Sequence, residues 1–143
     1  MTSLTIVRRI RARPSIVFEA MTTPEGISHW WCPDDGPVLF AQIDPRAGGN
    51  FRVRFRLTSG SEHECHGTYL EFVPNERYVA SWRWMDDAED AAASRVDVRF
   101  RPIPEGTELT VTHSQLKDAE SRRIHEEGWM ASLDKLDRYS AGQ

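Results

Sequence analysis

Residues 118–138, DAESRRIHEEGWMASLDKLDR, carry the pattern that decides the fold. Most of the charged side chains in this stretch lie away from a row of large side chains that recur at helical spacing: His125, Trp129, Leu133 and Leu136. Asp118 is placed to cap the first turn, and Glu120 follows it near the positive end of the helix dipole. The stretch is therefore predicted to form one long amphipathic helix.

The chain before this helix changes to a period of two, which is typical of strands that bury one face. Five segments show this period: 50–57, 62–73, 76–84, 94–102 and 106–114. Short connectors such as Ser59-Gly60 and Pro74-Asn75 separate them, so the strands are predicted to form an antiparallel meander. A sheet of this kind has the long helix as its one large partner, and by curling around that helix it can enclose space.

The N-terminal third of the chain adds smaller elements. Residues 4–11 are predicted as a first strand from their β-branched content. Pro14 can open a short helix, and Thr23-Pro24-Glu25 can start a second one, with a hydroxyl cap, a proline and an acid in order. A further short strand is expected between two clusters of turn residues, 34–37 and 44–50.

The order of these elements predicts an α+β fold with a curved antiparallel sheet around a long C-terminal helix. A chain of 143 residues fits one domain, which we assign to residues 1–143. With only Cys32 and Cys65, a disulfide framework is not expected. We find no apolar run long enough for a membrane span and no signal-peptide core, so a cytoplasmic protein without a membrane partner is expected.

The net charge of −4 comes from one acidic segment. Without Asp86, Asp87, Glu89 and Asp90 the balance is −4 + 4 = 0. Binding to nucleic acid needs concentrated positive charge, and the arginines at 52, 54 and 56 alternate with apolar residues as on the solvated face of a strand. Nucleic acid is therefore not expected as a partner.

Aromatic side chains are frequent on the predicted inner faces of the strands. Rings with a polar tip suit the wall of a partly wet pocket, whereas a small tightly packed core favours aliphatic residues. We therefore expect a cavity for a small apolar or aromatic molecule. The ten side chains predicted to contact it are Trp30, Phe55, Tyr69, Trp82, Trp84, Val98, Val111, His113, Trp129 and Leu133.

Motifs for catalysis and for metal binding are weak. His63 and His66 are three apart on a predicted strand, so their side chains face opposite ways, and we expect no metal and no other cofactor. His113 shares the apolar face of its strand, and Glu71 could face either side. These two are the candidate acid–base groups if chemistry occurs, but no residue is assigned a catalytic role.

Several motifs along the chain resemble one known family. They are Pro14, Val17-Phe18, Ala20, Pro24-Glu25, Trp30-Trp31, Gly48-Gly49 with Phe51, Gly67 with Tyr69-Leu70-Glu71, Thr107, Leu109, Val111-Thr112-His113, Gly128-Trp129 and Leu133. In this order they resemble the activator-of-heat-shock-protein-90-ATPase homologues of the START-like (SRPBCC, pollen-allergen-type) superfamily. The resemblance implies the helix-grip fold, in which a sheet grips the C-terminal helix around a ligand cavity.

Three functions remain as hypotheses. The first is non-catalytic binding of a small apolar or aromatic molecule. The second is a cavity enzyme of the polyketide cyclase or aromatase type, which the superfamily resemblance implies, with His113 or Glu71 in the acid–base role. The third is an interaction module for a chaperone or another protein, using the acidic segment 86–90 or the arginine-bearing sheet face. Homodimerisation is left open by the sequence.

Overall fold

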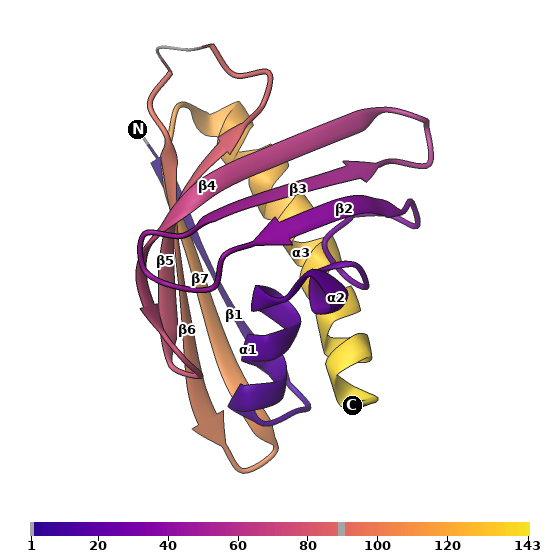
Figure 1. Cartoon of the computed structure of the whole chain (residues 1–143), viewed down its shortest axis with the longest axis vertical. Helices are drawn as coiled ribbons and strands as arrows, with labels where there is room; N and C mark the ends of the chain where they lie inside the picture. Colours follow the sequence, from indigo (N-terminus) through magenta and orange to yellow (C-terminus); the bar gives the residue numbers. More distant parts are fainter. Residues whose placement is uncertain (1, 89–90) are drawn as a thin grey trace.

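Seven antiparallel strands form one curved sheet in the computed structural model, which describes residues 2–88 and 91–143 (Figure 1). The strands are β1 (Thr2–Ile10), β2 (Val38–Ile43), β3 (Asn50–Arg56), β4 (Glu62–Val73), β5 (Arg77–Trp84), β6 (Ser94–Ile103) and β7 (Gly106–Leu116). Their order across the sheet is β1-β7-β6-β5-β4-β3-β2, so the first strand pairs with the last and the others follow the chain as a meander.

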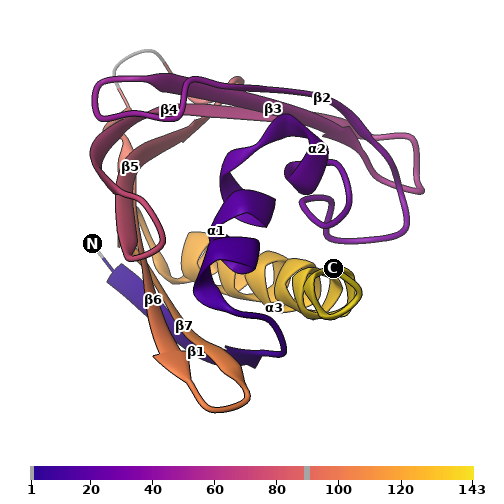
Figure 2. The ribbon, with the colours of Figure 1, turned by 60° about the horizontal axis from the view of Figure 1, so that its bottom comes forward.

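The concave side of the sheet holds all three helices, α1 (Pro14–Thr22), α2 (Pro24–Ile27) and α3 (Ala119–Ala141), as Figure 2 shows. The predicted caps are present. Asp118 accepts a hydrogen bond from the backbone N–H of Ser121 at 2.8 Å, and the Thr23 hydroxyl accepts one from Gly26 at 3.1 Å. The curved sheet around the long C-terminal helix confirms the α+β helix-grip architecture expected from the sequence.

A register irregularity in β4 settles which way Glu71 faces. The pairing of β4 with β5 shifts between Tyr69 and Glu71, so inward parity moves from odd to even positions. Tyr69 and Phe72 point toward the core, whereas Glu71 has a half-exposed side chain and pairs with Arg77 at 3.3 Å. Glu71 therefore lies on the outer face, away from the concave side.

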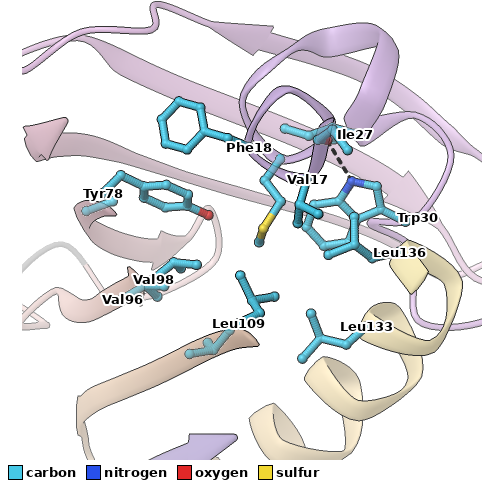
Figure 3. Packing of buried hydrophobic residues seen from close by; sticks show 14 of the residues in the cluster. Val17, Phe18, Ile27, Trp30, Tyr78, Val96, Val98, Leu109, Leu133 and Leu136 are labelled. Carbon is cyan, nitrogen blue, oxygen red and sulfur yellow. Dashed lines mark hydrogen bonds between the residues drawn. The ribbon is translucent and has the colours of Figure 1, made fainter. Parts of the chain in front are cut away.

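The C-terminal half of α3 anchors the helix to one end of the sheet. Leu133 and Leu136 are fully buried in the core cluster, and Figure 3 shows Leu133 near Leu109 of β7 and Leu136 beside Trp30. Ion pairs flank this apolar contact, since Arg8 reaches Asp134 at 2.7 Å and Arg11 reaches Asp137 at 3.2 Å. The helix is therefore held over β1 and β7.

The arginines at 52 and 54, on the sheet face named in the interaction hypothesis, form ion pairs. Arg52 and Arg54 pair with Glu64 across β3 and β4, at 2.8 and 3.4 Å, and Arg54 also pairs with Glu62. The positive charge of this sheet face is thus offset locally. Within the acidic segment 86–90, Glu89 and Asp90 lie outside the described residues.

Leu136→Ala should lower the free energy of unfolding by about 2–5 kcal/mol, because it leaves a cavity at a fully buried position of the α3 anchor. Urea unfolding followed by tryptophan fluorescence measures this loss. Met130→Ala is the control on the same helix, because Met130 is 43% exposed and lies outside the core cluster, and it should cost far less. Equal losses in the two variants would contradict the anchoring role.

Candidate functional site

A pocket of about 350 Å³ lies between the N-terminal half of α3 and the strands β3 to β5. It exists because α3 packs against β1, β7 and α1, while the sheet curves away from it toward β3. Exposed Asp86 and half-exposed Ile124 stand at its rim. This volume falls within the range of small-molecule sites.

Tryptophan dominates the wall of this pocket. The chain has five tryptophans, and all five line it: Trp30, Trp31, Trp82, Trp84 and Trp129. Phe55 of β3 and Leu57 add further apolar surface. Among the lining residues within the described part of the chain, Asp86 is the one carboxylate, and neither lysine nor arginine is present. The wall therefore suits an uncharged, flat, apolar molecule.

Five of the ten predicted contact residues line the pocket, namely Trp30, Phe55, Trp82, Trp84 and Trp129. Tyr69 lies deeper, against a second hollow of about 10 Å³, which is the space of a single water molecule. Trp31, Trp82 and Trp129 line both spaces and so separate the pocket from this hollow.

The other four predicted residues are packed in the core, with no exposed surface: Val98, Val111, His113 and Leu133. Strand parity correctly placed the residues of β6 and β7 on the inner face. It could not show that the helices cover this part of the face directly. The pocket lies instead over β3, β4 and β5.

Sequence reasoning missed several lining residues, of which His125, Gly128 and Ser132 are the most informative. They follow one another at spacings of three and four on α3, so they share a helix face with each other. That spacing was visible in the sequence, but an apolar-face criterion passes over a glycine and a serine. His63 and Pro33, from β4 and the loop after α2, were missed because only tertiary structure brings them to this pocket.

His113 lies behind the pocket wall and links Trp129 to Ser94 through hydrogen bonds. The Trp129 indole N–H donates to His113 Nδ1 at 3.1 Å, so the imidazole proton lies on Nε2, which donates to Ser94 Oγ at 2.8 Å. The Ser94 hydroxyl in turn donates to the carbonyl of Trp82 at 2.9 Å. Both ring nitrogens are therefore engaged, and the orientation of the Trp129 ring is fixed by a neutral histidine.

Burial lowers the pKa of His113 from 6.5 to about 3, with a smaller contribution from neighbouring His125. The two imidazole rings stand edge to face with their centroids 4.7 Å apart. Burial also lowers the pKa of His125, against the opposing effects of the Ser121 carbonyl and Asp87. Burial thus keeps both His113, behind the pocket wall, and His125, in the wall, uncharged at neutral pH.

Two side chains of α3 form hydrogen bonds at the end of the pocket near the loop after α2. The Ser132 hydroxyl donates to the carbonyl of Trp31 at 2.9 Å. The Lys135 ammonium donates to the carbonyls of Cys32 and Asp34 at 3.0 and 2.9 Å. Burial raises the pKa of the Cys32 thiol, which keeps it protonated. Within the described residues, no group of three or more His, Cys, Asp or Glu side chains could hold a metal ion.

The fold and the pocket together define the class of protein. A sheet that grips a long C-terminal helix, with a tryptophan-lined pocket between the two, is the helix-grip arrangement of the START-like superfamily. In the described part of the chain, every helix is too short or too polar to cross a membrane.

Comparison with known proteins identifies the family. The model of the family described as activator of Hsp90 ATPase homolog 1-like protein matches residues 11–141, and the chain belongs to this family. A search of curated proteins finds no match.

Solved structures support the same assignment. A protein from Chromobacterium violaceum has a TM-score of 0.86 and 28% identity, with 97% of this chain and 96% of that chain covered. A protein of the same family from Silicibacter pomeroyi has a TM-score of 0.86 and 26% identity, with 98% of both chains covered. An Aeromonas hydrophila protein, at 23% identity and a TM-score of 0.79 over 96% of this chain and 91% of that one, shares the fold.

The buried state of His113 predicts a loss of stability in acid. The unfolded chain binds a proton at this residue near pH 6.5, whereas the folded chain binds it only near pH 3, so lowering the pH between these values favours unfolding. The contribution is about 1.4 kcal/mol for each pH unit in that window. Urea unfolding from pH 7 to pH 4 should show a shallower slope in His113→Gln than in the wild type.

His29→Gln is the control for this pH series. The side chain of His29 is half exposed and stacks on Tyr139, and it takes no part in the hydrogen bonds of His113. This variant should therefore keep the acid slope of the wild type. An unchanged slope in His113→Gln would show that the buried imidazole is not the source.

Proposed function

We propose that this chain binds a small apolar or aromatic molecule in the pocket and does not change it chemically. The observation that carries the proposal is the gathering of all five tryptophans of the chain on one pocket of about 350 Å³. A core needs no such gathering, whereas flat rings with apolar faces provide large contact areas for an aromatic ligand.

Gly128 supplies independent support. Glycine in a helix interior is less favourable than alanine by about 1 kcal/mol, so its presence in the middle of α3 calls for a reason. Apart from its chain neighbours and the backbone of its own helix, no atom of the described residues lies within 4 Å of where a Cβ atom at Gly128 would stand, so close packing is not that reason. The residue lines the pocket, and the missing side chain leaves room in it.

The candidate acid–base groups favour binding over catalysis. His113 has both nitrogens engaged by Ser94 and Trp129, and its ring is fully buried behind the wall. Glu71 pairs with Arg77 on the outer face of the sheet. Neither group is within reach of a molecule in the pocket. The proposal concerns the pocket alone, and a chaperone partner stays a prediction from the family resemblance.

Gly128→Phe tests the proposal, because the new ring should enter the pocket and occupy the space of the ligand. We expect binding of the neutral fluorescent probe N-phenyl-1-naphthylamine to weaken at least about tenfold, the change that corresponds to about 1.4 kcal/mol. Titration followed by probe fluorescence measures the affinity. Gly128→Ala should raise the free energy of unfolding by up to about 1 kcal/mol, which shows that the position tolerates a side chain.

Glu127→Phe is the matched control, since it adds the same ring one residue earlier on α3, where the Glu127 side chain is 67% exposed. It should bind the probe as the wild type does. If folded Gly128→Phe protein bound the probe with wild-type affinity, the pocket would not be the binding site.

A further inference from the structure

The pocket contains two buried nitrogen atoms without a hydrogen-bond partner. In the described part of the chain, three buried side-chain nitrogen or oxygen atoms lack one: Trp82 Nε1, His125 Nε2 and Ser140 Oγ. The first two belong to residues that line the pocket, and the Trp82 side chain is more than nine-tenths buried. Native proteins rarely leave such atoms unpaired, so two of them at one pocket indicate a role in recognition.

The two atoms have opposite hydrogen-bonding roles. An indole Nε1 carries a hydrogen and can only donate. His125 Nδ1 lies 2.7 Å from the Ser121 carbonyl, which can only accept, so the imidazole hydrogen is on Nδ1. Since burial keeps this ring neutral, Nε2 carries a lone pair and accepts. Two residues that line the pocket thus carry one unpaired donor and one unpaired acceptor, both buried.

The donor and the acceptor belong to neighbouring rings. The Trp82 and His125 rings stand edge to face with their centroids 5.2 Å apart, and the Trp84 ring lies 4.4 Å from Trp82 and 6.0 Å from His125. Three other polar groups of the lining are already used. Trp129 Nε1 bonds to His113, Trp30 Nε1 donates to the carbonyl of Ala20, and the Ser132 hydroxyl donates to Trp31.

We propose that the pocket recognises an aromatic molecule bearing one neutral hydroxyl group, whose oxygen accepts from Trp82 Nε1 and whose hydrogen is donated to His125 Nε2. A hydroxyl is the smallest group that donates and accepts at one atom. Both nitrogens are already desolvated by the surrounding rings, so the ligand gains these bonds without removing water from them. Because both nitrogens are buried, the surrounding rings have to shift for the oxygen to reach them.

The charge of the pocket argues against an ionised ligand. A carboxylate cannot donate to the lone pair of His125 Nε2, and no lysine or arginine lines the pocket within the described residues. An ammonium group would find Asp86, but this side chain is exposed at the rim and far less favourable than a buried partner. The neutral hydroxyl is therefore the group that the wall complements.

Four related probes test this inference, which rests on the proposed function: naphthalene, 2-methoxynaphthalene, 2-naphthol and 2-naphthoate. Isothermal titration calorimetry at pH 7.5 gives each dissociation constant for the full chain. We expect 2-naphthol to bind about tenfold more tightly than 2-methoxynaphthalene, which keeps an oxygen acceptor but has no hydrogen to donate. Water solvates 2-naphthol better than naphthalene, so a preference for 2-naphthol over naphthalene reports on bonds made in the pocket.

His125→Phe tests whether the acceptor on His125 causes the preference for 2-naphthol over 2-methoxynaphthalene. This variant keeps a ring at position 125 and removes the acceptor, so the ratio of the 2-methoxynaphthalene and 2-naphthol dissociation constants should fall from about ten to below about three. His63→Phe is the matched variant at the other histidine of the pocket, whose Nε2 already bonds to Ser61 Oγ at 2.9 Å. It should alter both affinities alike and keep the ratio near ten.

The outcomes separate the two proposals. If the three neutral probes bind with dissociation constants within twofold of one another, the hydroxyl inference is wrong, while binding of aromatic molecules stands. If no probe binds, both are wrong. If 2-naphthoate binds most tightly, and more so below pH 6, the wall recognises a carboxylate through protonated His125, which also overturns the inference. The wild-type series decides the matter even if a variant fails to fold.

Discussion

The packing of α3 on β1 and β7 determines how much of the concave face of the sheet is left uncovered. Leu133 and Leu136 fix the C-terminal half of the helix there, and ion pairs from Arg8 of β1 and from Arg11 just after β1 hold it at that edge of the sheet. The sheet continues to curve beyond this contact toward β2 (Figures 1 and 2). One straight helix cannot follow that curvature, so the space over β3 to β5 has to be filled by other groups or remain open.

Rings fill part of that space and line the remainder. Trp31, Trp82 and Trp129 separate the pocket from the packed core, and the hydrogen bond from Trp129 to His113 keeps this wall in place. Burial keeps the His113 ring neutral, which leaves its Nδ1 free to accept this bond. The Trp129 ring is thereby already ordered, so little of its side-chain freedom remains to be lost when a molecule enters.

The order of elements could be predicted from the sequence because periodicity, prolines and caps are local signals. Helix-grip topology was expected, and Asp118 and Thr23 cap the helices as predicted. The site was predicted only in part, because parity identifies the inner face but not the portion that a helix covers, as Val98 and Val111 show. The irregularity beside Glu71 and the open space at Gly128 arise from tertiary packing, which single-sequence patterns do not contain.

The indole N–H signals of the five tryptophans offer the most direct measurement of the central claim, that this pocket binds a small aromatic molecule. Two-dimensional ¹H–¹⁵N spectra of the labelled protein, recorded during a titration with naphthalene, report on every wall residue of this type at once. The account predicts saturable shifts of the Trp82, Trp84 and Trp129 signals with one common dissociation constant. Indole signals that stay unchanged up to the solubility limit of naphthalene would contradict it.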